Sequence, residues 1–232
     1  LSQLIDWDRI YGSGHSLGSG QVQTFTRTHP EFFAAVASTS FASQTEGNYE
    51  AVPTMLVTGQ SDPPFLMDDL WTADQLKEWF SYLAQANVLK VAEATRGNAD
   101  EKEEGTARTW TYTWNNVDEI PMVVWGQTYL REHNCYPAEV PMAWEFLSHY
   151  SKDADGNRFY SASAFAEDDQ KEIVEGKEAG RDLDSITDLE YDYSQAAQLP
   201  PDGLVHQEHR RGRQRQDGRW PHRKGVHRPR GL

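Results

Sequence analysis

The sequence is short of three features that define common protein classes: cysteine, long apolar runs and a leader segment. Cys135 is the only cysteine in 232 residues, which excludes an intrachain disulfide and a cysteine-based zinc site. No stretch approaches 18 continuous apolar residues, and this argues against a membrane span. No signal peptide is visible, because the chain opens at Leu1 without a basic n-region.

Charge is distributed unevenly along the chain. The whole chain has a net charge of −14. Residues 206–232 hold eight arginines and one lysine against two acidic residues, a net charge of +7, so the remainder carries −21. An acidic body argues against nucleic acid as a partner, since phosphate binding needs a basic surface. A surface that is acidic for solubility is the favoured interpretation of this charge.

Apolar patterning predicts alternating strands and helices. Strands are expected at 9–12, 32–38, 54–58, 109–114 and 122–125. Helices are expected at 17–28, 73–89 and 138–150, with a loop at 40–52 and a charged turn at 98–105. The run FFAAVAS at 32–38 is typical of a strand buried on both faces of a parallel sheet. The order of elements therefore predicts an α/β fold.

The composition changes after residue 151. Residues 152–205 are acidic with few apolar side chains, which predicts a weakly ordered extension. Residues 206–232 are rich in Arg, Gly, His and Pro and nearly free of aliphatic side chains. This tail is either a basic tail or the translation of a shifted reading frame, and we favour the second. We expect a folded region at 1–151 followed by a disordered C-terminal tail.

The motif GHSLG at residues 14–18 has the form of a nucleophile elbow. In such an elbow a strained turn between a strand and a helix exposes the central serine, here Ser16. The flanking residues must be small, which assigns that role to Gly14 and Gly18. The helix N-terminus that follows favours a developing oxyanion, and the backbone N–H of Leu17 would be one donor.

Two other interpretations of this loop are weaker. A chance match in a Gly/Ser-rich turn is reduced by the expected strand before the motif and the expected helix after it. A phosphate-binding loop is disfavoured because GSGHSLGSG lacks the Walker lysine, and its glycines miss the Gly-x-Gly-x-x-Gly register.

A serine nucleophile needs a histidine base and a carboxylate that orients it, here in the chain order Ser, Asp or Glu, His. Asp62 follows the strand at 54–58, where active-site groups of α/β sheets gather. A turn aspartate before prolines is its alternative role. Asp68 and Asp69 lie nearby, but a position at the start of the next helix suits capping better.

His133 is the expected base, because it follows the last strand and precedes the last helix. A plain surface histidine is its alternative. His15 adjoins the nucleophile, but its side chain should point away from Ser16. His29 stands at a helix end before a proline, and His149 falls in the last turn of a helix, where the dipole suits a cation. Four further histidines lie in the tail.

Two weaker signals favour structural roles. The segment DADGN at 153–157 is similar to the start of a calcium loop, but its glycine comes too early for that loop and Ala164 stands where the closing glutamate is required, so a plain turn is favoured. A group of aromatic residues could line a substrate groove, but alternating aromatics in strands are more often core. These residues are Trp110, Tyr112, Trp114, Trp125 and Tyr129.

Three segments carry a family resemblance. The chain resembles polyhydroxybutyrate-depolymerase-like and feruloyl-esterase-like serine hydrolases of the α/β-hydrolase fold over about residues 5–160. The segments are DRIYGSGHSLGSGQVQTFTRTHPEFFAAVASTS, PTMLVTGQSDPP and REHNCYPAEVPMAWEFLSHYS. The resemblance implies Ser16 as nucleophile, Asp62 as acid and His133 as base. It also implies hydrolysis of carboxylic esters, no metal or organic cofactor, and an extracellular or periplasmic location.

The resemblance also implies that the chain is the C-terminal portion of the catalytic domain. Members of this family place several strands before the elbow, and an early loop gives the second oxyanion donor. We therefore expect N-terminal strands to be missing. The leading hypothesis is an esterase acting on a small-molecule or polymeric ester. The alternatives are a serine peptidase on the same fold and a catalytically incompetent fragment.

Overall fold

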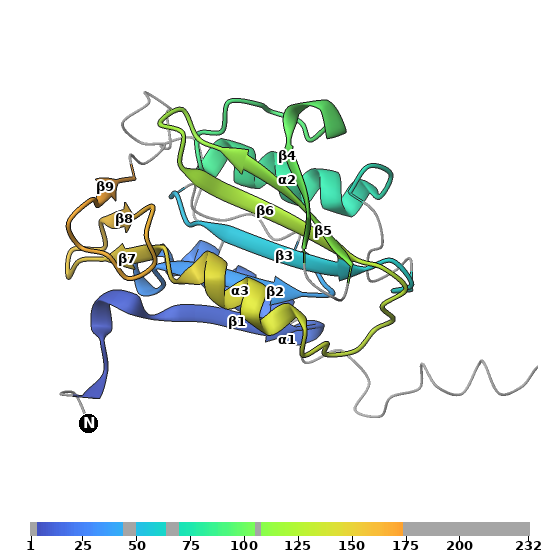
Figure 1. The fold of residues 1–232 in the computed structure, drawn as a ribbon, viewed down its shortest axis with the longest axis horizontal. Coiled ribbons are helices and arrows are strands. Elements are labelled where there is room, and N and C mark those ends of the chain that lie inside the picture. Colours follow the sequence, from blue (N-terminus) through green and yellow to red (C-terminus); the bar gives the residue numbers. More distant parts are fainter. Residues whose placement is uncertain (1–3, 44–49, 64–69, 105–107, 174–232) are drawn as a thin grey trace, which may run out of the picture. The chain divides into compact units, whose positions relative to one another are not determined.

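A computed structural model describes residues 4–43, 50–63, 70–104 and 108–173 (Figure 1). The sequence predictions for Asp68 and Asp69, and those for 174–232, lie outside the described residues.

Strands and helices are interspersed along the described part of the chain. The strands are β1 (Tyr11–His15), β2 (Ala35–Thr39), β3 (Thr54–Gly59), β4 (Asp100–Glu104), β5 (Thr109–Asn115), β6 (Pro121–Thr128), β7 (Tyr150–Lys152), β8 (Arg158–Tyr160) and β9 (Lys171–Glu172). The α-helices are α1 (Leu17–Thr28), α2 (Asp74–Ala86) and α3 (Glu139–Leu147). Short 3-10 helices lie at Trp7–Arg9, Pro30–Phe32 and Arg96–Asn98.

A mixed sheet dominates the fold. In the described part of the chain, six strands pair in the order β1-β2-β3-β6-β5-β4. The neighbouring strands β1, β2, β3 and β6 run parallel to one another. β5 pairs with β6, and β4 with β5, in antiparallel fashion. β7, β8 and β9 form a separate antiparallel sheet. The α/β class predicted from the sequence is therefore present.

The parallel strands β2, β3 and β6 are largely buried on both faces, because helices cover both sides of the sheet. β3 is buried at every position, as its apolar run predicts. Val36 of β2 faces α1 and α2, whereas the next residue, Ala37, faces α3. Figure 1 shows α3 across one face of β1–β3, with α1 and α2 on the other side of the sheet. In the described residues no helix is long and apolar enough to cross a membrane.

Helix α2 buries the stripe that its sequence predicts. Leu76, Trp79, Phe80 and Leu83 recur at the spacing of one helix face, and all four are buried. Arg27 of α1 lies over the ring of Tyr82 from α2, 4.1 Å from its centroid, so the two helices also contact each other.

The aromatic residues of β5 and β6 belong to the core. Tyr112, Trp114 and Trp125 are buried, and the Tyr112 and Trp125 rings stack with centroids 5.2 Å apart. Both indole N–H groups are hydrogen-bonded, since Trp125 donates to the buried Thr58 hydroxyl and Trp114 donates to the Asn98 side chain. The core interpretation of this group therefore holds for these three residues.

Three boundaries differ from the sequence predictions. The charged turn expected at 98–105 is a strand over Asp100–Glu104, because pairing with β5 imposes the extended form on an edge segment that has no apolar pattern. The helix expected to reach residue 150 ends at Leu147, so His149 follows the helix and its Nδ1 contacts the Ser161 carbonyl. The boundary expected after residue 151 falls inside β7, and residues 152–173 contain β8 and β9.

Candidate active site

The carboxyl ends of four neighbouring parallel strands carry the predicted site. Ser16 follows β1, Ser40 follows β2, Asp62 follows β3, and the loop with His133 follows β6. Parallel strands end at one edge of the sheet, so residues that are far apart in the sequence meet there.

The backbone at Ser16 forms a tight turn. Its φ of 57° lies in the left-handed region, which non-glycine residues rarely adopt and which is associated with functional sites. Ser16 N–H donates to the Thr39 carbonyl at 3.0 Å, and α1 begins at the next residue. The strand expected at 9–12 in fact runs on to His15, so it leads directly into the turn.

Close packing explains only one of the two glycines of the motif. A Cβ on Gly14 would lie 2.3 Å from the Gly18 carbonyl oxygen, so this position has no room for a side chain. A Cβ on Gly18 would have no heavy atom within 4 Å, apart from neighbours in its own helix. The expectation that both positions must be small is wrong for Gly18, because a side chain there would enter open space.

The three predicted residues are joined by hydrogen bonds. The Ser16 Oγ lies 2.8 Å from His133 Nε2, and the His133 Nδ1 lies 2.9 Å from Asp62 Oδ1. The Asp62 side chain is fully buried, whereas the His133 side chain is 28% exposed. The structure thus places Ser16 and His133 in contact although they are 117 positions apart in the chain, and Asp62 completes a continuous series of hydrogen bonds.

Leu17 lies where an oxyanion donor is expected. It is the first residue of α1, so its N–H has no carbonyl partner within the helix. The N-terminus of α1 adds its partial positive charge at the same point. The donor role of Leu17 stays a prediction.

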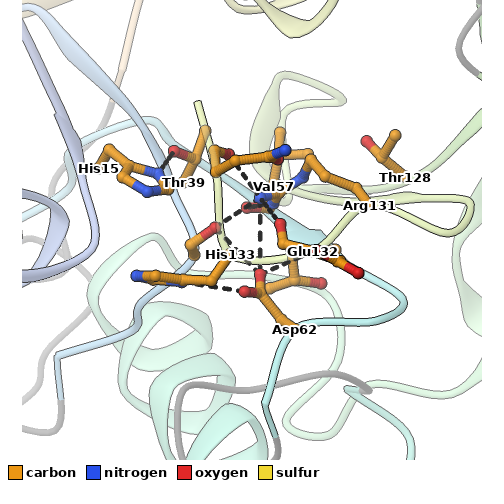
Figure 2. Close-up of polar contacts among 12 residues, drawn as sticks. His15, Thr39, Val57, Asp62, Thr128, Arg131, Glu132 and His133 are labelled. Atoms are coloured by element: carbon orange, nitrogen blue, oxygen red, sulfur yellow. Dashed lines mark hydrogen bonds and ion pairs between the residues drawn. The ribbon is translucent and has the colours of Figure 1, made fainter. Parts of the chain in front are cut away.

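The second oxygen of Asp62 is held from several sides. Asp62 Oδ2 accepts hydrogen bonds from the Ser40 hydroxyl at 3.0 Å and from the Gly59 N–H at 3.1 Å. The Arg131 Nη1 lies 3.5 Å from the same oxygen. Figure 2 draws the contacts of Asp62 with His133 and with Arg131 as dashed lines. These contacts leave Oδ1 for His133.

His15 lies beside His133, contrary to the expectation that its side chain points away from Ser16. Its ring centroid is 4.9 Å from that of His133, and its Nδ1 lies 2.9 Å from the Thr39 hydroxyl (Figure 2). Burial lowers the pKa of His15, and the neighbouring His133 and Arg131 lower it further. The short strand that continues to His15 turns this side chain toward the same edge as Ser16.

A groove adjoins these residues on the α3 side of the sheet. It has a volume of about 470 Å³ and is mostly apolar. Its lining includes Gly14 and His15 from the turn before Ser16, Tyr136 from the loop after His133, and Val140 and Trp144 from α3. Val140 is 65% exposed and Trp144 is 51% exposed. The aromatic residues at this groove are not those of the strand group that the sequence suggested.

Sequence reasoning missed three polar residues at the site. Ser40 could have been found, because it stands at the carboxyl end of a strand next to the elbow. Arg131 and Glu139 carry no such signal, since a charged residue in a loop or first helical turn is usually exposed. Both are buried here.

The segment DADGN forms a plain turn between β7 and β8. The Asp153 carboxylate accepts hydrogen bonds from the backbone N–H groups of Asp155 and Asn157 and from the Asn157 side chain. These bonds lower the pKa of Asp153. Among the described residues, no group of three or more His, Cys, Asp or Glu side chains is placed to hold a metal.

Comparison with known proteins gives no family assignment. No family model matches this sequence, and no curated protein matches it.

Proposed function

We propose that the protein is a serine hydrolase of carboxylic esters, built on part of an α/β-hydrolase fold. The observation that carries the proposal is the hydrogen-bonded series from Ser16 through His133 to Asp62. A strained serine between a strand and a helix supports it independently, because that turn presents the hydroxyl to a substrate.

The chemistry follows from these contacts. As Ser16 Oγ bonds to the ester carbonyl carbon, His133 Nε2 takes the hydroxyl proton, and Asp62 stabilises the imidazolium. The oxyanion collapses, the alcohol leaves with the proton from His133, and an acyl-enzyme remains. Water then attacks the acyl carbon and gives its proton to His133, and the acid is released as Ser16 regains its proton. The apolar groove beside the elbow suits an apolar acyl or alcohol group.

Hydrolysis of p-nitrophenyl butyrate beside the matched p-nitroanilide tests this proposal. The chain should cleave the ester faster, and S16A should lose activity by about 100-fold or more. The matched control is S163A, which removes an exposed hydroxyl far along the chain and should leave the rate unchanged. Faster cleavage of the anilide would favour a peptidase, and equal ester rates for S16A and the wild type would contradict the nucleophile.

A further inference from the structure

Arg131 and Glu139 form a buried ion pair directly behind the proposed triad. The Arg131 Nε lies 2.7 Å from Glu139 Oε1, and the two side chains are only 1% and 4% exposed. Glu139 Oε1 also accepts a hydrogen bond from the Thr128 hydroxyl. Removing two charges from water is costly, and a buried pair is weak evidence for stability. The pair therefore calls for another explanation.

The contacts of Arg131 converge on the loop that carries His133. Its Nη1 donates to the carbonyls of Glu132 at 3.2 Å and Asn134 at 3.1 Å, which are the residues on either side of His133. The same nitrogen donates to Ser40 Oγ at 2.6 Å, and Ser40 in turn donates to Asp62.

The other end of the guanidinium fixes this loop to the sheet. Its Nη2 donates to the Val57 carbonyl at 3.1 Å, at the end of β3. Close packing adds to this contact, because a Cβ on Gly59 would lie 2.2 Å from the Arg131 carbonyl oxygen. One guanidinium thus connects three groups to β3. They are the two residues on either side of His133 and the Ser40 hydroxyl that donates to Asp62.

The charge of Arg131 opposes the function of Asp62 unless it is balanced. A cation 3.5 Å from the Asp62 carboxylate weakens the support that this carboxylate gives to the His133 imidazolium. Glu139 supplies the balancing anion from α3. The charged and titratable groups that face this region are Asp62, Arg131, Glu139, His15 and His133.

We propose that Arg131 is a positioning residue for His133 and Asp62, and that Glu139 sets the pH range of the base by balancing the charge of Arg131. This inference rests on the proposed function. Neither residue contacts the reacting atoms, so both act through the triad.

Two conservative variants separate the two roles. E139Q keeps an oxygen that can accept from Thr128 and Arg131, but it removes the charge. R131K keeps the charge, but a single ammonium cannot reach Val57, Ser40 and both carbonyls beside His133. The matched controls are E145Q on the exposed side of α3 and R9K in the surface ion pair with Asp6.

The readout is the rate of Ser16 labelling by a fluorophosphonate, measured from about pH 5 to pH 9, where a histidine base titrates. E139Q should move the acid limb of this pH–rate profile by about half a pH unit to lower pH. The reason is that the unbalanced charge of Arg131 disfavours the His133 imidazolium. R131K should lower the plateau by about 10- to 100-fold without moving the limb, because His133 is misplaced. E145Q and R9K should follow the wild type.

The outcomes distinguish this inference from the proposed function. An E139Q profile that superimposes on the wild type, or an R131K plateau equal to the wild type, would overturn the inference alone. A lower melting temperature with unchanged profiles would overturn it too, since that result leaves only a structural role for the pair. A wild-type chain that is not labelled at Ser16 would contradict both the inference and the proposed function.

Discussion

At the scale of single residues, the polar contacts of Asp62 determine which ring nitrogen of His133 carries the proton. Asp62 Oδ2 faces donors, namely the Gly59 N–H and the Ser40 hydroxyl, with the Arg131 guanidinium nearby. The oxygen that remains must accept from His133 Nδ1. The proposed base can then present a free Nε2 to the Ser16 hydroxyl.

Asp62→Asn should reverse this arrangement. The amide oxygen would turn to the three donors, and the amide N–H would face His133 Nδ1, so the ring would carry its proton on Nε2 and could not accept from Ser16. Ester turnover should fall by about 10,000-fold with little change in KM. Asp74→Asn, at the exposed start of α2, is the matched control. Turnover within tenfold of the wild type would speak against the role of Asp62.

His15 shows the limit of residue-level prediction. Position in the chain identified Ser16, Asp62 and His133 as neighbours, because the carboxyl ends of parallel strands share an edge. The direction of the His15 side chain depends on how far β1 extends, and the apolar pattern underestimates that length. Sequence patterns also do not predict the burial of Arg131, since that burial depends on Ser40 after β2, Val57 in β3 and Glu139 in α3.

At the scale of elements, the tight turn between β1 and α1 gives a paired prediction. Gly14→Ala should destabilise the protein by about 1–3 kcal/mol and reduce activity, because its Cβ would meet the Gly18 backbone. Gly18→Ala should change stability by no more than about 0.5 kcal/mol, because its Cβ meets open space. Urea unfolding measures both changes. A Gly18→Ala loss as large as that of Gly14→Ala would show that the packing is described wrongly.

Elements with a clear apolar period were predictable, and an edge strand without one was not. The stripe of α2 and the buried run of β3 follow directly from spacing and composition. β4 has the sequence DEKEE, which carries no strand pattern. Its strand form comes from backbone pairing with β5, and charged side chains are common on such edges because they discourage pairing with other chains.

At the scale of the whole molecule, one buried and two half-buried tyrosines make the stability of the fold depend on pH in the alkaline range. Tyr11 donates to the Tyr150 carbonyl at 2.8 Å, and burial raises the pKa of Tyr11 from 10.0 to about 12. Burial also raises the pKa of Tyr150 well above its usual value and raises that of Tyr160. These groups contribute stability that is present below about pH 10 and is lost as the pH rises through their folded pKa values.

The wild type should therefore lose stability above about pH 10, and Tyr11→Phe should lose it less steeply. At neutral pH the variant should lose about 1 kcal/mol for the missing hydrogen bond. Thermal unfolding at a series of pH values gives both quantities, with Tyr129→Phe as the control at an exposed ring. Parallel curves for Tyr11→Phe and the wild type would contradict the assignment.

The α/β class and the meeting of Ser16, Asp62 and His133 at one sheet edge are properties of the whole fold that the sequence predicted. Ester hydrolysis is the proposal that joins them. The most direct test is to treat the full chain with a fluorophosphonate and map the adduct by peptide mass spectrometry. The account predicts one adduct, on Ser16, that is lost in His133→Asn. No adduct, or an adduct on another serine while Ser16 stays unmodified, would contradict it.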